Sequence, residues 1–286
     1  MAAALPWFGG AVCAASPIRP DALKVLTCNI RVDIPADGKA GNGWADRKDL
    51  CVEVMKAQRA DLIGLQECQH VHITYLKHQL PEYDTFGWSK PEAPANPLNS
   101  ILFSRARFEL LSNGGFWLSE KPQVPGSKSW DSSQSRFVNW VQLRDRKSGK
   151  ELRHWNTHFD HIGQRAREHS ARLIVDASTA LSAELPQLLT GDLNAHGTNP
   201  ALKTLAAGGW TDTYAAIHGS KDPGFTGHAF LGKQRAEQRG KGKPGGKIDW
   251  IWCRGPVKPL AAEIIRDSRN GRYPSDHYFV SATVAL

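Results

Sequence analysis

Apolar and polar positions alternate over short stretches of this chain, and most of these stretches predict β-strands. Residues 24–30 and 61–66 carry mainly apolar side chains on both faces, so each predicts a buried, central strand. The other predicted strands cover residues 101–103, 116–118, 136–143, 151–156, 187–190, 248–252 and 278–285.

Helical periodicity appears between the strands. In residues 47–58, Leu50, Val54 and Met55 share one stripe, and Asp46 is the expected N-cap. Further helices are expected at residues 70–80, 164–184 and 199–207. Helices alternate with strands early and late in the chain, whereas strands follow one another in the middle. This order predicts an α/β fold of two stacked mixed sheets with helices on their outer faces.

The pattern predicts one domain at residues 24–286, because neither a mid-chain linker nor a fixed-period repeat interrupts it. Residues 1–23 form a separate N-terminal segment. Its small apolar residues, with Ala14 and Ala15, resemble the remnant of a signal peptide, but a positive n-region is missing. Exported and cytoplasmic locations therefore both stay open. No run of about 18 apolar residues occurs, so no transmembrane segment is expected.

The chain is basic overall, and much of its excess positive charge lies in one short stretch. The chain has 36 Lys and Arg against 28 Asp and Glu, a net charge of +8. Six of the cations lie between Lys233 and Lys247, opposed only by Glu237, and the Gly- and Lys-rich residues 232–246 predict a mobile loop. A basic loop attracts polyanions such as nucleic acid, anionic lipid or phosphorylated sugars.

Polar residues recur where the apolar runs end. A strand carries its last side chains to the edge of a sheet, so several strand ends can converge in one cleft. Each polar residue alone also fits a turn, a helix cap or a solvated surface position. The residues in question are Asn29, Glu67, Asn156, His158, Asp192, Asn194, Asp249, Asp276 and His277.

Together these residues resemble the endonuclease/exonuclease/phosphatase superfamily of metal-dependent phosphoesterases, over residues 24–285. The matching pieces are Thr27-Cys28-Asn29-Ile30-Arg31, Leu65-Gln66-Glu67, Asn156-Thr157-His158, Thr190-Gly191-Asp192-Leu193-Asn194, Lys247-Ile248-Asp249-Trp250-Ile251 and Ser275-Asp276-His277. Trp117-Leu118-Ser119 and residues 156–161 resemble a largely uncharacterised bacterial branch. The resemblance implies a four-layer α/β/β/α sandwich with its site at one rim of the sheets.

Hydrolysis of a phosphate ester requires a cation, a positioned water and a proton acceptor. Mg²⁺ or Mn²⁺ needs only one or two carboxylates besides waters and substrate oxygens, so Glu67 is an adequate principal ligand. The resemblance implies Asn29 near the metal, and Asp276 is a further candidate ligand. His277, held by Asp249 or Asp276, is a candidate general base or an electrostatic partner for the phosphate.

Asp192 and Asn194 are two residues apart, so in an extended segment their side chains share a face. By resemblance Asp192 orients or deprotonates the attacking water, Asn194 supports the phosphate, and His158 donates to a phosphoryl oxygen. Arg136 and Arg31 are candidate phosphate-binding residues. Asp160 and His161 extend the histidine motif, and the sequence assigns them no role.

We therefore expect a Mg²⁺- or Mn²⁺-dependent hydrolase of phosphodiesters or phosphomonoesters, most simply a monomer, with DNA or RNA as the favoured substrate class. Inositol phosphates and phospholipid head groups at a membrane surface are the alternative substrates. A catalytically inactive polyanion-binding protein is the alternative of another class. A carbohydrate-interaction protein built on the ten tryptophans is disfavoured, because five of them alternate within strand-like runs, as packing predicts.

Overall fold

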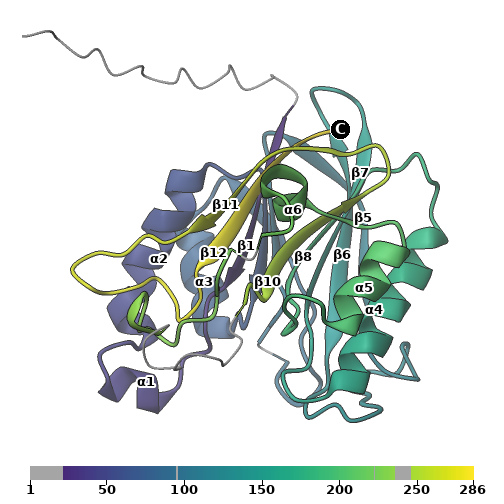
Figure 1. The fold of residues 1–286 in the computed structure, drawn as a ribbon. Helices are drawn as coiled ribbons and strands as arrows, with labels where there is room; N and C mark the ends of the chain where they lie inside the picture. Colours follow the sequence, from purple (N-terminus) through teal and green to yellow (C-terminus); the bar gives the residue numbers. More distant parts are fainter. Residues whose placement is uncertain (1–21, 95, 222, 236–245) are drawn as a thin grey trace, which may run out of the picture.

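The computed structural model describes residues 22–94, 96–221, 223–235 and 246–286. Two six-stranded sheets lie face to face between two helical layers (Figure 1). One outer layer holds α2 (Trp44–Gln58) and α3 (His70–Gln79), and the other holds α4 (Gln164–Thr179) and α5 (Pro200–Ala207). The predicted α/β/β/α sandwich is confirmed.

The first sheet has the strand order β11-β12-β1-β2-β4-β3. β1 runs parallel to β2 and antiparallel to β12, so the sheet is mixed and β1 is central, as predicted. The strands are β1 (Leu23–Asn29), β2 (Leu62–Gln66), β3 (Tyr83–Phe86), β4 (Ile101–Ser104), β11 (Lys258–Ile265) and β12 (Phe279–Ala285).

The second sheet has the order β5-β6-β7-β8-β10-β9. Only β7 and β8 pair in parallel; their neighbours pair antiparallel. The strands are β5 (Phe108–Trp117), β6 (Phe137–Asp145), β7 (Glu151–His158), β8 (Gln187–Asp192), β9 (Thr211–Asp212) and β10 (Asp249–Arg254).

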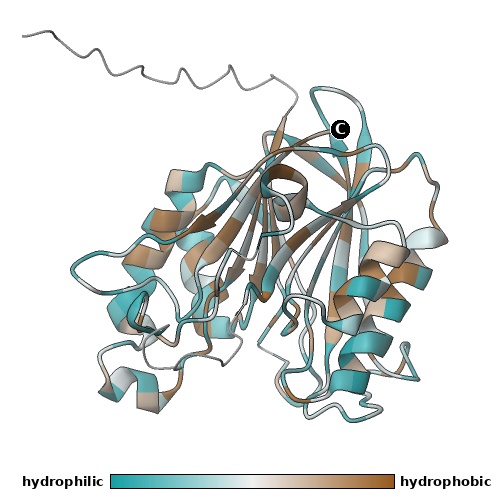
Figure 2. Ribbon diagram, in the orientation of Figure 1, coloured by the Kyte–Doolittle hydropathy of each residue, from teal (hydrophilic) through white to brown (hydrophobic). Residues whose placement is uncertain are grey.

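Apolar side chains fill the space between the sheets and the space beneath each helical layer. Figure 2 marks hydrophobic residues in brown along the strands and on the helices. Leu23, Val25 and Leu62 of the first sheet pack with Val141 and Leu188 of the second. Cys28, Cys51, Cys68 and Cys253 are buried with free thiols, as expected of small apolar residues. Burial of this surface supplies most of the driving force for folding.

A buried polar network joins the two sheets close to the strand ends. Asn156 of β7 donates to the carbonyls of Leu65 (2.8 Å) and Ser100 (3.0 Å) of the first sheet. Its Oδ1 accepts from Gln66 (2.7 Å) and from Thr190 (3.0 Å). All donors and acceptors of this amide are therefore used, and such networks fix one relative position of the packed elements.

Gly64 of β2 has no Cβ, which leaves the space that the side chains of the network occupy. A Cβ at this position would lie 2.1 Å from the Thr190 hydroxyl and 2.5 Å from Asn156 Oδ1. Only glycine therefore allows the sheets to approach closely here.

Helix α2 begins at Trp44, and its N-cap is Gly43, so the prediction of Asp46 as N-cap is wrong. The Asp46 carboxylate instead accepts the Gly43 N–H at 3.1 Å, which satisfies a free donor at the start of the helix.

Helix α4 ends at Thr179, before the predicted end at Glu184. The hydroxyls of Ser178 and Thr179 each donate to the Val175 carbonyl at 2.9 Å. Such side-chain bonds compete with the helical ladder, which explains the earlier end.

Strand β5 is much longer than the predicted residues 116–118. The sequence pattern misses most of this strand because it contains Gly114 and Gly115, and glycine is rare in strands. Here a Cβ on Gly114 would lie 2.7 Å from the Trp140 ring, so the indole of β6 lies over the glycine backbone.

Five observed elements were not predicted. Helices α1 (Pro35–Lys39) and α6 (Thr213–His218) and strands β3 and β9 are too short for periodicity to show. Strand β11 contains Pro259 with a bulge beside it and lies at the sheet edge, where proline is tolerated.

Residues 1–21 and most of the predicted basic loop (236–245) lie outside the described residues. Within the described ranges, none of the helices combines the length and the apolar character that a membrane span requires.

Candidate active site

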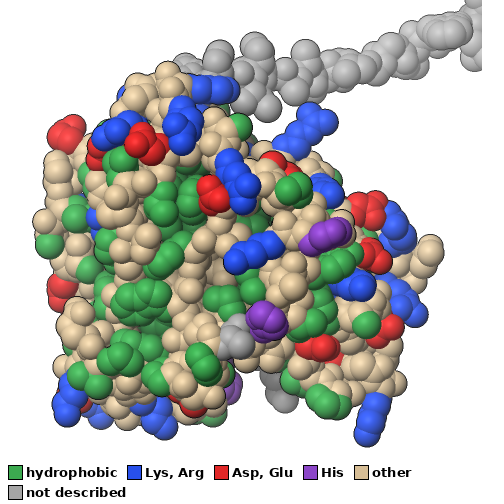
Figure 3. All heavy atoms as spheres, turned by 180° about the vertical axis from the view of Figure 1, so that it is seen from behind, with side chains coloured by type: hydrophobic (Ala, Val, Ile, Leu, Met, Phe, Trp, Pro, Cys, Tyr) green, Lys and Arg blue, Asp and Glu red, His purple; other side chains and the backbone are tan. Residues whose placement is uncertain are grey.

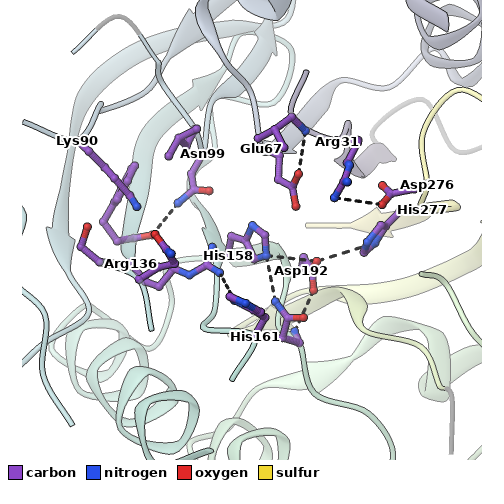
Figure 4. A pocket seen from close by; sticks show the side chains of 16 residues that line it. Arg31, Glu67, Lys90, Asn99, Arg136, His158, His161, Asp192, Asp276 and His277 are labelled. Carbon is purple, nitrogen blue, oxygen red and sulfur yellow. Dashed lines mark hydrogen bonds and ion pairs between the residues drawn. The ribbon is translucent and has the colours of Figure 1, made fainter. Parts of the chain in front are cut away.

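The predicted residues converge on one cavity of about 440 Å³ at the rim of the two sheets (Figure 4). Asn29 and Asp249, which are almost fully buried, lie behind its wall and are hydrogen-bonded to residues that line it. The predicted residues that line the cavity are Arg31, Glu67, Arg136, His158, Asp192, Asn194, Asp276 and His277.

Glu67 is the first residue after β2, and its carboxylate is held from two sides. Oε2 accepts the Val32 N–H at 2.8 Å, and Oε1 accepts from Asn29 Nδ2 at 3.2 Å. Glu67 has φ 62°, and Arg31 in the loop after β1 has φ 57°. Left-handed backbone is costly for residues with a Cβ, and it concentrates at functional sites, where the surrounding structure maintains it.

Asn29, at the end of β1, connects two carboxylates. Its Nδ2 donates both to Glu67 and to Asp192 Oδ2 (3.0 Å), while its Oδ1 accepts the Arg31 N–H at 3.0 Å. The amide therefore presents hydrogens to the carboxylates, and its oxygen is already engaged. This geometry favours an orienting group over the metal ligand expected from the sequence.

His277 pairs with Asp249, which decides between the two carboxylates proposed for it. His277 Nδ1 lies 2.9 Å from Asp249 Oδ2, whereas Asp276 lies 3.7 Å from the Arg31 guanidinium. Burial lowers the pKa of His277, but Asp249, Asp276 and Asp192 outweigh it and raise that pKa well above the ordinary value.

Asp192 lies between two histidines at the end of β8. Its Oδ2 is 3.4 Å from His158 Nε2 and 3.9 Å from His277 Nδ1. Burial and the neighbouring Asp249 raise the pKa of Asp192 to about 7, against the opposing effect of His277. A carboxyl group with its pKa near 7 can both take up and release a proton at neutral pH.

Asn194 reaches the cavity by a turn, so the expectation of an extended segment is wrong. Its φ is 46°, and its N–H donates to Asp192 Oδ1 at 2.9 Å, the hydrogen bond of an Asx turn. Its Nδ2 lies 3.0 Å from His158 Nε2 and donates to the Phe159 carbonyl at 3.1 Å. Burial, reinforced by Arg136, lowers the pKa of His158 well below its usual value, which keeps this imidazole neutral.

Two groups of residues could hold a divalent cation. Ligand atoms of Asp192, Asp249 and His277 all lie within 4.8 Å of one another. However, the His277 nitrogen in this group is 2.9 Å from Asp249 and is engaged in that hydrogen bond. The Glu67 carboxylate fits a hydrated Mg²⁺ or Mn²⁺ better, because each oxygen accepts only one hydrogen bond and both face the cavity.

The sequence missed several residues of the site. Lys90 and Asn99 line the cavity from the long loop between β3 and β4, which has no periodicity, so only the tertiary fold reveals them. Arg47 of α2 is buried and donates to the carbonyls of Ile30 (2.5 Å), Arg31 (2.7 Å) and Pro274 (3.1 Å). It ties the loop after β1 to the loop that carries His277, and its place in an amphipathic helix gave no signal of this.

The chain is similar to known phosphoesterases over nearly its whole length. A family model described as the Endonuclease/Exonuclease/phosphatase family matches residues 26–277. An endonuclease/exonuclease/phosphatase from Bacteroides vulgatus is 29% identical, with a TM-score of 0.82 over 93% of this chain and 99% of that chain. The mannosyl-6-phosphatase of Bacteroides thetaiotaomicron is 26% identical, with a TM-score of 0.80 over 92% and 100%. An uncharacterized protein of Acanthamoeba polyphaga mimivirus is 25% identical over 182 residues, 60% of this chain and 67% of that protein.

Proposed function

Since this chain belongs to the Endonuclease/Exonuclease/phosphatase family, whose members hydrolyse phosphate esters, we propose that it is a Mg²⁺- or Mn²⁺-dependent phosphatase of small phosphomonoesters. One observation carries the proposal: a single cavity brings the Glu67 carboxylate, the Asp192–His277–Asp249 group and the Arg136 guanidinium together. An inactive polyanion-binding protein would not need this set complete.

In the proposed reaction Glu67 would hold the cation, and Asp276, which lines the same cavity, would be a further ligand. The bound ion supplies positive charge that neutralises the phosphoryl oxygens. Asp192 orients the attacking water and accepts its proton, and Asn29 keeps the Asp192 carboxylate in place.

The remaining residues bind the phosphoryl group. His277, kept protonated by Asp249, donates to a phosphoryl oxygen, and Asn194 and His158 contribute further polar contacts. Arg136 and Arg31 add guanidinium groups, whose planar donors match phosphate geometry. These contacts strengthen as negative charge develops in the transition state.

A small substrate fits the site better than a polymer. The cavity of about 440 Å³ lies within the range of roughly 300–1,000 Å³ typical of small-molecule sites. The similarity to a mannosyl-6-phosphatase over almost the whole chain supports a sugar phosphate or a comparable polyol phosphate. Inositol phosphates belong to the same chemical class.

Nucleic acid is the second candidate substrate, favoured by the net charge of +8. One of the cations expected to carry it is less available than the sequence implied. Lys247 is buried and bonded to Asp212 at 3.2 Å, and Lys241 and Lys243 lie outside the described residues. On the face seen in Figure 3, Lys and Arg are dispersed among Asp and Glu.

The test is a turnover screen of the purified protein with Mg²⁺, Mn²⁺ or chelator. The substrates are hexose and inositol phosphates, phospholipids, and single- and double-stranded oligonucleotides. Metal-dependent release of inorganic phosphate from the small monoesters supports the proposal. Cleavage of oligonucleotides alone, weakened by neutralising Lys233, Arg235, Lys241 and Lys243, would replace it with the second candidate.

A further inference from the structure

One end of the cavity carries a cation, Lys90, that the proposed reaction does not use. Arg136 lies next to it along the cavity, and His161 lies beside Arg136 on the side of Asp192 (Figure 4). Asp276 and His277 lie at the opposite end of the same cavity. We call Lys90, Arg136 and His161 the basic end.

The Arg136 side chain is 15% exposed and is only partly satisfied by hydrogen bonds. Its Nη2 is 3.3 Å from His161 Nδ1, and its Nε has no hydrogen-bond partner among the described residues, with Asp160 Oδ2 at 3.7 Å. Burial lowers the pKa of Arg136, against the attraction of Asp160, Asp192 and Glu67. A partly buried guanidinium that lines a cavity is suited to bind an anion.

Asp160 fixes the position of this end and compensates part of its charge, with Oδ2 3.7 Å from Arg136 Nε. Its buried carboxylate accepts hydrogen bonds from two loops. The donors are Ser133 N (3.0 Å), Ser133 Oγ (2.8 Å), Gln134 N (2.9 Å), Ile162 N (3.0 Å) and Gly163 N (2.8 Å). These bonds hold the loops that carry Arg136 and His161, and they divide the negative charge of Asp160 between these donors and the Arg136 guanidinium.

Lys90 adds a second cation to the basic end. Its pKa is lowered, first by burial and then by the charge of Arg136. No carboxylate of the described residues lies within ion-pair distance of its ammonium group. Like charges held together cost free energy unless an anion joins them, and a bound phosphate would remove that cost.

We propose that the basic end binds a second phosphate group of the same small substrate, so that bisphosphorylated sugars or polyols are preferred over their monophosphates. This inference rests on the proposed function and adds to it a substrate class. The scissile phosphate lies at the Glu67 end, and the cavity holds both groups of one small molecule. Arg136, the member of the basic end that also binds the scissile phosphate in the proposed reaction, contributes to the binding of both phosphates.

The test compares matched monophosphates and bisphosphates of one hexose and of inositol. For the wild type we expect kcat/KM to favour the bisphosphate by at least about tenfold, as expected of one charge-assisted contact. Lys90→Met and His161→Gln should each lower this ratio several-fold, and the exposed Lys56→Met in α2 should leave it unchanged. Equal kcat/KM for both substrates in the wild type would overturn the inference while leaving the proposed function intact.

A binding measurement separates the two proposals. In excess chelator, calorimetry should show tighter binding of the bisphosphate than of the monophosphate, and Lys90→Met should remove the difference. The binding measurement does not depend on turnover. It therefore tests the second phosphate site even if the screen shows that the proposed function is wrong. If a short oligonucleotide gains affinity through Lys90 and the bisphosphates do not, the second phosphate belongs to a strand and the small-molecule assignment is wrong.

Discussion

Both ends of the cavity are lined by charged or titratable side chains, but the balance of acidic and basic groups differs between them. At the reaction end, carboxylates and histidines alternate: Asp249 pairs with His277, and Asp192 lies between His277 and His158. At the basic end, Arg136 and Lys90 line the same cavity, and the Asp160 carboxylate 3.7 Å from Arg136 also accepts several hydrogen bonds.

This difference suits the reaction end to hydrolysis and the basic end to binding of the substrate. Alternating acids and bases exchange protons with a substrate and return to their starting state, which a hydrolysis requires. Adjacent cations that share a single carboxylate cannot do so, but they gain stability when an anion binds. We therefore expect changes at the reaction end to act on the rate, and changes at the basic end to act on the choice of substrate.

The largest expected effect tests the two histidines against each other. His277→Ala should lower kcat by about 10²–10⁴-fold, the usual loss when a positioned proton-transfer or charge-stabilising group is removed. His161→Ala should cost less than about tenfold in kcat on a monophosphate and should act mainly on the bisphosphate preference. Steady-state kinetics on both substrates measures this. Equal losses of kcat in the two variants would contradict the division of the cavity.

Glu67→Gln tests the metal. The amide keeps the shape of the side chain but removes its charge, and Mg²⁺ gives up its hydration shell reluctantly without that charge. We expect the Mg²⁺ or Mn²⁺ concentration for half-maximal activity to rise by about tenfold or more, and the saturated rate to fall. Calorimetric titration measures the binding directly, with the exposed Glu263→Gln as control. Unchanged metal affinity would exclude Glu67 as the principal ligand.

Asp160→Asn tests whether the basic end depends on its buried carboxylate. One amide oxygen cannot accept all the bonds that two carboxylate oxygens accept, and each buried donor left unsatisfied costs about 1–3 kcal/mol. We expect a lower melting temperature and a smaller bisphosphate preference, with KM affected more than kcat. A loss confined to kcat would place Asp160 at the reaction end instead.

The sequence predicted the reaction end far better than the basic end. Asn29, Glu67 and Asp192 end strands whose apolar pattern is strong, and consecutive strand ends meet at one rim, so their convergence follows from the fold class. Lys90 lies in a loop whose path depends on tertiary packing. No local pattern indicates that it approaches Arg136.

The same contrast explains the errors within the reaction end. The strand pattern locates Asp192, but the left-handed turn at Asn194 depends on one side-chain hydrogen bond, which period-two reasoning does not include. Arg47 looks like any helical cation in the sequence. Its role arises because two loops far apart in the chain end beside it.

The smallest expected effect concerns Lys247, a cation that the sequence grouped with the basic loop. It is buried, lies 3.5 Å from the centre of the Trp250 ring and bonds to Asp212 at 3.2 Å. Burial lowers the pKa of Lys247 to about 8, although Asp212 opposes the shift. Unlike Lys90, it does not line the catalytic cavity. Lys247→Met should therefore leave turnover and the bisphosphate preference within about twofold of wild type, the usual scatter for a change away from a site.

Its effect should appear instead in the pH dependence of stability. Between about pH 8 and 10.4 the folded protein has lost this proton while the unfolded chain still binds it. The unfolded chain therefore holds more protons in this window, and the contribution of Lys247 to the free energy of unfolding rises with pH. From pH 7 to 9.5 the wild type should gain about 2 kcal/mol relative to Lys247→Met, measured by urea unfolding at both values. If the free energy of unfolding of wild type and Lys247→Met changed with pH in the same way, Lys247 would be solvated and available to a polyanion. That result would favour nucleic acid as the substrate.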